Sequence, residues 1–344
     1  MKSVQIADHA VGEGAPVFVV CEIGGNFNTL EEGKKEIDLA VQCGADAVKI
    51  QTFRAETLVT RHSRFSTVAE GVNQYELFKR FEVSSEWHAE LFAHAAARGI
   101  LAFSTPSHYN DVDLLEKLKV PVYKLGSDDL TNLPFLAYVA SKKKPVILST
   151  GMADMQEAKE AVETVRAAGN PQVLVLHCVS GYPVLDFAAL NLKAMAALRD
   201  TLEVPVGFSD HTVGTLASCA AVSLGACFIE KHFTLDKKLQ TPDSFFSADP
   251  AEMTQLVRSI RDLEKALGSG EKKPNESEIA LRGEIRKSVI ARRKIAKGAA
   301  IRAEDVIVKR PGTGIAPKDC AKVIGRKAAR EIAEDELIDW SMLE

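Results

Sequence analysis

Lysine, histidine and acidic residues recur at the ends of short apolar segments along this chain. Lys49 in KIQTF and Lys124 in YKLGS are two such cations, while His211 in SDHT and His232 in EKHF are two such imidazoles. Cations bind phosphate and carboxylate groups, and two neutral imidazoles beside a carboxylate such as Glu230 make an open site for a divalent metal. A metal in an open site polarises a carbonyl oxygen as a Lewis acid. These residues indicate a small anionic substrate beside an activated carbonyl, which is typical of carbon–carbon bond formation.

Eight apolar, β-branched segments alternate with amphipathic helical patterns. The segments cover residues 17–24, 47–53, 101–106, 122–127, 145–151, 173–178, 204–210 and 227–233. Several helical patterns end in glycine, the expected helix stop. Strands that alternate with helices form a parallel sheet, and eight such units favour a closed (β/α)8 TIM barrel over an open doubly wound sheet.

In a barrel of this kind the functional site lies at the carboxyl ends of the strands. All eight segments carry polar residues there, namely Glu22, Lys49, Gln51, Ser104, Thr105, Lys124, Ser127, Ser149, Thr150, His177, Ser209, Asp210, His211, Glu230, Lys231 and His232. Cations and hydroxyls suited to a phosphate and a carboxylate are supplied by Lys49, Thr105, Lys124, Ser127, Ser149 and Ser209. For either lysine taken alone, a buried ion pair is the alternative. Glu22 or Glu230 is the carboxylate expected beside the histidines.

The composition excludes several classes of protein. The chain of 344 residues has 43 basic and 47 acidic residues, a formal net charge of −4, so no global positive field attracts nucleic acid or anionic lipid. Its six cysteines are scattered, which favours reduced thiols and a cytoplasmic location. The N-terminus has no apolar stretch typical of a signal peptide. The weakly polar stretch 213–229 is interrupted by Thr, Ser and Gly, so no membrane span is expected.

The sequence changes character near residue 268, where GSGEKKPNESE begins. We expect a catalytic barrel over residues 1–268, a linker over 269–285 and a small, mainly β domain over 286–344. The last segment has short β-like runs, glycine turns and an excess of Lys and Arg. Most of these charges are expected to be ordinary solvated surface.

The strings EIGGNFN, KIQTF, FSTP, YKLGS, STGM, HCVSGYP, GFSDHT and IEKHFTLDK, followed by KRPGTG, resemble the sialic acid synthase family of nonulosonate synthases. The resemblance covers essentially the whole chain in order and spacing. It implies a barrel followed by an antifreeze-like SAF domain. It also implies condensation of phosphoenolpyruvate with an N-acylated hexosamine, such as N-acetylmannosamine, to give a nine-carbon acid and phosphate.

The resemblance also implies roles for individual residues. The six cation and hydroxyl residues named above match positions that hold phosphoenolpyruvate, and His211 and His232 match ligands of manganese or magnesium. Positions that meet the amino sugar are matched by Gln51, Tyr182, Asp243 and Arg310, the last of which enters the other subunit's site in a domain-exchanged homodimer. Catalytic carboxylates are expected at Glu22, Asp129 and Glu230.

Some positions depart from the family's pattern. Asp128-Asp129 stands where Gly-Glu is common, so the carboxylate expected to move protons is a shorter Asp129. Ser244 stands in place of a histidine, and Ser180-Gly181 replaces an Asn-containing version. These changes are expected on the sugar side, which leaves open N-acetylmannosamine, its 6-phosphate, or a 2,4-diacetamido-trideoxyhexose leading to legionaminic or pseudaminic acid.

Two rival functions remain to be compared. A Schiff-base aldolase would use Lys124 or Lys49 as its nucleophile, but it would not need two histidines at strand ends. A non-catalytic carbohydrate- or ice-binding protein built around the terminal domain would need no polar strand ends at all. We therefore expect the metal-assisted synthase.

Overall fold

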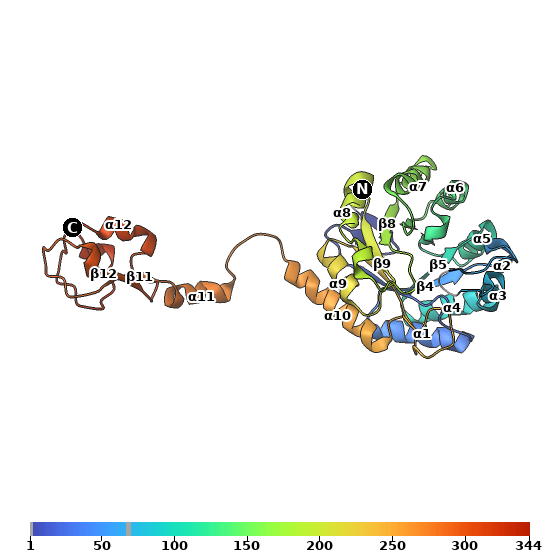
Figure 1. The fold of residues 1–344 in the computed structure, drawn as a ribbon, viewed down its shortest axis with the longest axis horizontal. Coiled ribbons are helices and arrows are strands. Elements are labelled where there is room, and N and C mark those ends of the chain that lie inside the picture. Colours follow the sequence, from blue (N-terminus) through green and yellow to red (C-terminus); the bar gives the residue numbers. More distant parts are fainter. Residues whose placement is uncertain (1–2, 67–69) are drawn as a thin grey trace. The chain divides into compact units, whose positions relative to one another are not determined.

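The computed structural model describes residues 3–66 and 70–344 of the chain. The chain divides into two compact units, Met1–Gly268 and Ser269–Glu344, whose helices and strands are shown in Figure 1. Each unit has a hydrophobic core of its own, as separate domains do.

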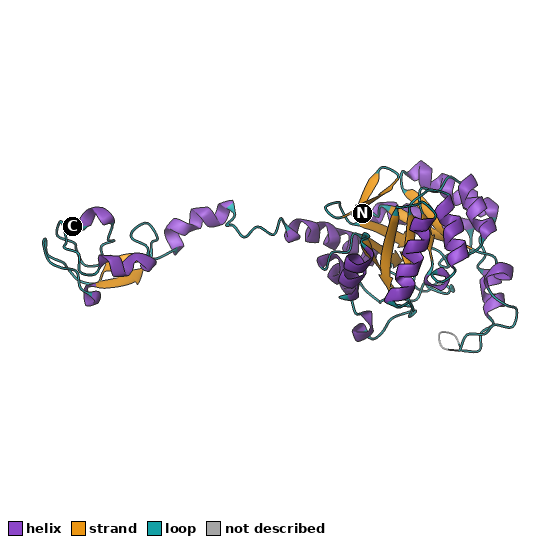
Figure 2. Cartoon of the chain, turned by 90° about the horizontal axis from the view of Figure 1, so that it is seen from above, coloured by secondary structure: helices purple, strands orange, loops and turns teal. Residues whose placement is uncertain are grey.

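The first unit is a closed barrel of eight parallel strands, which confirms the predicted fold. The strands are β3 (Phe18–Glu22), β4 (Ala47–Thr52), β5 (Leu101–Pro106), β6 (Tyr123–Leu125), β7 (Val146–Ser149), β8 (Val173–Cys178), β9 (Val206–Asp210) and β10 (Phe228–His232). Neighbours in the barrel are consecutive along the chain, and β10 pairs with β3 to close it. Figure 2 shows helices packed around these strands. Each predicted apolar segment contains one strand.

The helices that follow the strands cover the outside of the barrel (Figure 2). They are α1 (Leu30–Cys43), α4 (Ser85–Arg98), α5 (Tyr109–Lys117), α6 (Leu133–Ser141), α7 (Met155–Ala167), α8 (Ala194–Leu202), α9 (Leu216–Ser223) and α10 (Pro250–Leu267), with the short α2 (Ala55–Leu58) and α3 (Gln74–Arg80) between β4 and α4. Helix α1 begins at a capping box between Thr29 and Glu32 and ends at Gly44 in the left-handed conformation. These local signals fix where strand and helix alternate.

The register of the barrel brings predicted site residues side by side. Glu22 lies opposite Lys49 on one side and His232 on the other, while Gln51 lies opposite Thr105. Because all the strands are parallel, their carboxyl ends meet at one rim, and side chains at equal heights converge there.

A β-hairpin that the sequence analysis missed precedes the barrel. It consists of β1 (Ser3–Ile6) and β2 (His9–Gly12). Its apolar side chains Val4, Ile6 and Val11 are buried in one cluster with residues that begin the barrel strands, such as Phe18 and Phe228. The hairpin therefore closes the amino end of the barrel, opposite the rim that carries the polar residues.

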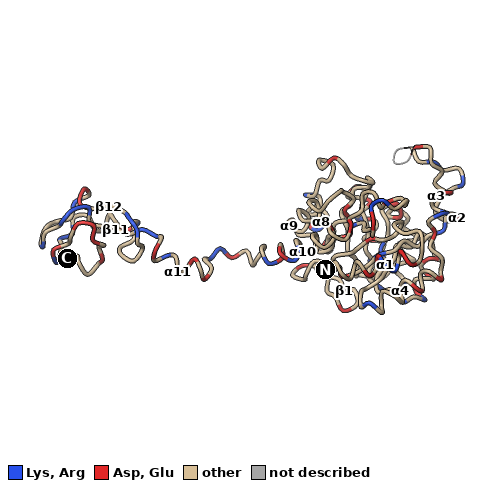
Figure 3. The backbone as a smooth tube through the Cα atoms, turned by 90° about the horizontal axis from the view of Figure 1, so that it is seen from below, with Lys and Arg blue, Asp and Glu red and all other residues tan. Residues whose placement is uncertain are grey.

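The second unit contains a short antiparallel pair of strands and a small core. The pair is β11 (Ser288–Ala291) and β12 (Val306–Lys309), and α12 (Cys320–Val323) follows. Within the stretch expected to be a linker, α11 (Glu276–Ile285) begins at a capping box of Asn275 and Glu278, which the sequence analysis overlooked. Residues 269–344 carry 17 Lys and Arg against 13 Asp and Glu, distributed as in Figure 3.

None of the helices in the described part of the chain is long and apolar enough to cross a membrane.

We expect Ile6→Ala to lower the free energy of unfolding of the barrel by about 2–5 kcal/mol, because a fully buried side chain leaves a cavity when it is truncated. Urea denaturation followed by circular dichroism measures the change. Gln5→Ala, at an exposed position of the same strand, is the control and should change stability by less than about 0.5 kcal/mol. Equal effects of the two substitutions would show that the hairpin does not support the barrel core.

Candidate functional site

Two lysines and two glutamates form a buried charge cluster at the carboxyl end of the barrel. Lys49 Nζ forms an ion pair with Glu22 and lies 3.7 Å from Glu230 Oε2, while Lys124 Nζ lies 3.3 Å from Glu230 Oε1. Lys49 also donates to Thr105 Oγ1 at 3.0 Å. The four charged side chains are at most 5% exposed. Buried charges of this kind persist only when they are paired, and this cluster unites four residues from β3, β4, β6 and β10.

The two carboxyls of the cluster are driven toward different protonation states. Burial raises the pKa of Glu22 more than the neighbouring Lys49 lowers it. Burial also acts to raise the pKa of Glu230, but Lys124 and Lys49 outweigh it and lower that pKa to about 2. Two carboxyls whose pKa values move apart can take acid and anion roles. Glu230 is therefore the permanent anion between the lysines, and Glu22 is the carboxyl able to carry a proton.

Glycines after β3 allow the site's side chains to approach closely. A Cβ on Gly24 would lie 2.4 Å from Glu22 Oε1 and 2.6 Å from Gln51 Cγ. Gln51 Nε2 donates to Glu22 Oε1 at 3.1 Å. Only glycine leaves room for the Gln51 side chain to orient the Glu22 carboxyl, which accounts for the glycines in EIGGN.

Hydroxyl groups line the same end of the barrel. Ser209 donates to Glu230 Oε1 at 2.9 Å, and Ser127 Oγ accepts from the backbone N–H of Gly151 at 3.0 Å. Ser149 Oγ is buried and has no hydrogen-bond partner among the residues described. A Cβ on Gly151 would lie 2.3 Å from Ser180 Oγ, so Ser180 also faces this group of hydroxyls. Ser180 was not among the predicted site residues, although its position two residues after the end of β8 is a signal for a place at this rim.

His211 and His232 lie together, with ring centroids 5.3 Å apart. His211 Nδ1 lies 3.0 Å from the carbonyl oxygen of Val179; since a carbonyl only accepts, Nδ1 carries the proton and Nε2 is left free in the neutral ring. His232 Nδ1 is buried without a hydrogen-bond partner among the described residues. Burial lowers the pKa of His232 well below its usual value, so this ring is neutral. His232 is thus in the form that binds metal. Burial acts to lower the pKa of His211, but Cys178, the carbonyl of Val179 and Glu230 outweigh it and raise that pKa, so metal binding at His211 would displace a proton.

Tyr182 and Asp243 border the two histidines. The ring of Tyr182 lies 4.4 Å from that of His211, measured between centroids, and Asp243 Oδ2 lies 3.6 Å from His232 Nδ1. Phe246 packs against His232 with ring centroids 5.2 Å apart. An aromatic wall and one carboxylate therefore stand beside the imidazoles.

The donor set fits a divalent metal that takes two ligands from the protein. The unpartnered Nδ1 of His232 and the ring of His211, oriented by the carbonyl of Val179, would supply the two nitrogens. In the described parts of the chain, no three or more His, Cys, Asp or Glu side chains are grouped so that they could hold a metal. Any remaining coordination positions would belong to water and substrate, as in an open catalytic site.

Asp210 and Lys231, which the sequence placed among the converging polar residues, pair with each other instead. Lys231 Nζ lies 3.1 Å from Asp210 Oδ2 and donates to the carbonyl oxygen of Thr212 at 2.7 Å. Asp210 also accepts from Thr212 N and Oγ1 and from Ser218 Oγ. Alternate residues of a strand face opposite sides, so Glu230 and His232 face the site while Lys231 supports the wall behind it.

Three expected residues stand apart from the charge cluster. Asp129 accepts from Asn132 Nδ2 at 3.2 Å within its own turn. Ser244, expected on the sugar side, is fully buried, and its hydroxyl bonds to Thr234, Thr241 and Asn26. Ser244 therefore packs inside the loop after β10. Arg310 belongs to the second unit, directly after β12, and its role stays a prediction.

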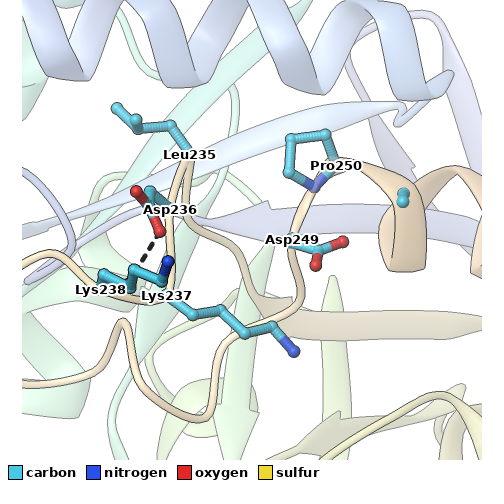
Figure 4. Close-up of a pocket in the computed structure, with 7 residues that line it drawn as sticks. Leu235, Asp236, Lys237, Lys238, Asp249 and Pro250 are labelled. Atoms are coloured by element: carbon cyan, nitrogen blue, oxygen red, sulfur yellow. Dashed lines mark hydrogen bonds between the residues drawn. The ribbon is translucent and has the colours of Figure 1, made fainter.

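Surface cavities lie outside this set of residues. One of about 500 Å³ is lined by Leu235, Asp236, Lys237, Lys238, Asp249, Pro250 and Ala251 (Figure 4). Its Lys237 is neutralised by Glu252 at 2.6 Å, and the backbone N–H of Lys238 donates to Asp236. None of the predicted site residues lines this cavity, so it is not the candidate site.

We expect the stability of Asp129→Asn, measured relative to the wild type, to increase from pH 4.5 to pH 8. Burial and the neighbouring charge of Asp128 raise the pKa of Asp129 to about 6, against an unfolded value of about 3.9. The folded chain therefore holds this proton more tightly, and wild-type stability declines as the pH rises through this interval. Thermal denaturation from pH 4.5 to 8 measures the difference. A stability difference that does not change with pH would contradict the raised pKa.

Comparison with known proteins identifies the family. Residues 36–272 match the NeuB family, and residues 286–344 match the SAF domain. The chain is 43% identical over 343 residues to the N,N'-diacetyllegionaminic acid synthase of Legionella pneumophila, covering 97% of this chain and 96% of that one. It is 36% identical over 323 residues to a pseudaminic acid synthase of Campylobacter jejuni, covering 92% and 93%. The N-acetylneuraminic acid (sialic acid) synthetase structure from Leptospira borgpetersenii has 32% identity and a TM-score of 0.73, covering 81% of this chain and 94% of that one. The chain therefore belongs to the NeuB family of nonulosonate synthases, which form a carbon–carbon bond by condensing phosphoenolpyruvate with a sugar, and it carries the C-terminal SAF domain.

Proposed function

We propose that this chain joins phosphoenolpyruvate to a 2,4-diacetamido-2,4,6-trideoxyhexose, giving an acid of the legionaminic type and phosphate. The observation that carries this choice of acceptor is the 43% identity to a synthase named for N,N'-diacetyllegionaminic acid, against 36% for the pseudaminic acid synthase. N-acetylmannosamine, the acceptor first expected from the sequence, is the second candidate. It is favoured by the likeness to the N-acetylneuraminic acid synthetase, with a TM-score of 0.73.

The buried charge cluster supports phosphoenolpyruvate as the donor. Lys49 and Lys124 are the cations for its phosphate and carboxylate, and Ser149 Oγ at the end of β7, which has no hydrogen-bond partner among the described residues, is a further donor. Thr105, Ser127 and Ser209 supply further hydroxyls. Because Glu230 already holds both lysines in place, the cations are oriented before the substrate arrives and need little reorganisation.

The reaction joins C3 of phosphoenolpyruvate to C1 of the open-chain sugar. The π electrons of the C2–C3 bond form the new bond to C1, and the π electrons of the aldehyde C=O move to its oxygen, which takes up a proton and becomes a hydroxyl. This leaves C2 electron-deficient, and water adds there and loses one proton to a base. The C2 hydroxyl then loses its remaining proton as the C2–O bond to phosphate breaks, which gives the keto acid and inorganic phosphate. We assign the base to Glu22, because its raised pKa lets it hold that proton. Holding both reactants in register supplies much of the rate.

The histidine pair supports activation of the sugar. Enzymes of this family generally depend on a divalent metal, and Mn²⁺ or Mg²⁺ held by His211 and His232 would polarise the aldehyde oxygen as a Lewis acid. Gln51, Tyr182 and Asp243 would bind the rest of the sugar. The aromatic surface of Tyr182 and Phe246, with ring centroids 6.0 Å apart, suits the methyl group of a 6-deoxy sugar.

The acceptor is tested by phosphate release from phosphoenolpyruvate with Mn²⁺. We expect release that requires both metal and acceptor, with the highest kcat/KM for the 2,4-diacetamido sugar of the legionaminic series. The comparison sugars are N-acetylmannosamine, its 6-phosphate and the acceptor of the pseudaminic series. A preference for N-acetylmannosamine would select the second candidate. Trapping of substrate by borohydride, with no effect of chelator, would select the Schiff-base aldolase instead.

His232→Ala is expected to abolish turnover while phosphoenolpyruvate still binds, because His232 serves the sugar and the lysines serve the anion. Isothermal titration of phosphoenolpyruvate and the phosphate-release assay separate the two effects. His94→Ala is the control, since His94 pairs with Asp38 on the surface of α1, and it should behave as wild type. Full activity of His232→Ala without added metal would refute the assignment.

We further propose that Arg310 completes the site of a second copy in a homodimer. The KRPG turn that carries Arg310 is anchored within its own unit, because Gly312 N–H donates to the carbonyl oxygen of Gly283 at 2.7 Å. A Cβ on Gly312 would lie 2.5 Å from Arg286 Cβ, so glycine is needed for this packing. A guanidinium carried by an anchored turn can bind sugar hydroxyls or an amide carbonyl.

Mixing inactive variants tests whether Arg310 acts between subunits. Arg310→Ala and His232→Ala should each lose most activity as homodimers. After unfolding and refolding together, mixed dimers contain one site with an intact barrel and an intact Arg310, so activity should return. Refolding each variant alone is the control. No recovery in mixtures shown by mass spectrometry to contain heterodimers would contradict action across subunits.

A further inference from the structure

A fully buried amide, Asn26, lies where the segment after β3 meets the segment after β10. Its Nδ2 donates to the carbonyl oxygen of Phe233 at 2.7 Å and to Ser247 Oγ at 3.0 Å. Its Oδ1 accepts from Ser244 Oγ at 3.3 Å. Because the carbonyl of Phe233 only accepts, this bond determines which end of the amide is nitrogen. One side chain from the β3 end thus holds three residues of the β10 end.

Asn26 is linked to Asp243 through the hydroxyl of Ser247. Ser247 Oγ, which accepts from Asn26, donates to the backbone carbonyl of Asp243 at 2.7 Å. On the opposite side, a Cβ on Gly25 would lie 3.2 Å from Asp243 Oδ2. Asp243 is therefore held between the Asn26 bonds and the backbone of Gly25, and its carboxylate faces His232.

The same amide also holds the backbone next to His232. Phe233 follows His232 directly, and its N–H donates to the carbonyl oxygen of Glu22 at 2.8 Å. Within the loop after β10, the Ser244 hydroxyl forms hydrogen bonds with Thr234 Oγ1 at 3.0 Å and with the hydroxyl of Thr241. Networks of fully satisfied buried bonds specify one arrangement, and this network fixes the histidine and the aspartate relative to β3.

We propose that Asn26 is a positioning residue for the acceptor sugar. The inference rests on the proposed function, since it assigns Asp243 and His232 to the acceptor. Asn26 holds residues 233–247 so that the Asp243 carboxylate stays beside His232. Its hydrogen bonds go to Phe233, Ser244 and Ser247, while the charge cluster of Lys49 and Lys124 is held by Glu22 and Glu230. Acceptor binding therefore depends on Asn26, and phosphoenolpyruvate binding does not.

Asn26→Ala and the milder Ser247→Ala test the proposal, with Asn170→Ala as a matched control. Asn170 is also buried, and its amide donates to the carbonyl oxygens of Ala140 and Lys144, but it precedes β8 at the amino end of the barrel. All three variants remove buried hydrogen bonds and should lower the melting temperature. Only Asn26→Ala and Ser247→Ala should raise the acceptor KM, by about tenfold or more for Asn26→Ala, with the Kd for phosphoenolpyruvate within about twofold of wild type.

Hydrogen exchange without substrates gives a second measurement that does not depend on turnover. We expect amides of residues 234–248 to exchange faster in Asn26→Ala and Ser247→Ala than in wild type or Asn170→Ala. Wild-type exchange in that segment, or equal losses of acceptor and phosphoenolpyruvate binding, would overturn the role of Asn26. If the wild type turns over none of the acceptors, the proposed function fails, and the exchange result still decides whether Asn26 holds the loop.

Discussion

The site is organised by two buried lysines that share the carboxylate of Glu230, one of which also pairs with Glu22. Desolvating four charges at the centre of a barrel is costly, and only their mutual attraction within a few ångströms offsets it. Lys49 lies between Glu22 and Glu230, and Glu230 lies between Lys49 and Lys124. The pKa values of the two glutamates are separated, and when Glu22 holds a proton the two lysines outnumber the remaining carboxylate of Glu230. Gly24, the hydroxyls of Thr105 and Ser209 and the register of β10 against β3 are all in contact with this cluster or position its members.

In β9 and β10, one face of the strand carries site residues and the other carries residues that support the barrel wall. In β10, Glu230 and His232 face the interior while Lys231 faces outward and pairs with Asp210 of β9. Asp210 and Lys231, which precede the two histidines, therefore pair on the outer side of the strands. His211 and His232 lie together on the inner side. Asn26 likewise holds the segment after β3 to the segment after β10 through buried hydrogen bonds. The geometry of the site is therefore fixed by contacts that the substrates do not touch.

Much of this arrangement follows from the sequence, for identifiable reasons. The alternation of apolar segments and helices is enough to predict eight strands, and the polar strand ends follow from the topology. The hairpin of residues 3–12 was not predicted because its two strands follow each other with no helix between them, outside the strand–helix alternation that reveals the barrel. Polarity alone predicts Lys231 in the site. Because successive side chains of a strand face opposite sides and Glu230 faces the site, Lys231 faces outward. The burial of Ser244 depends on partners 10 and 218 residues away, which no local pattern reveals.

The hairpin that closes the amino end has a kinetic consequence. With that end filled by Val4, Ile6 and Val11, ligands reach the charge cluster only from the carboxyl rim. The lysines belong to the strands themselves, whereas Tyr182, His211 and Asp243 stand at or beyond the strand ends. In the arrangement that we propose, a sugar bound among the outer residues lies across the path to the lysines. We therefore expect the small anion to bind first and the sugar second, and the anion to be exchanged only after the sugar has left.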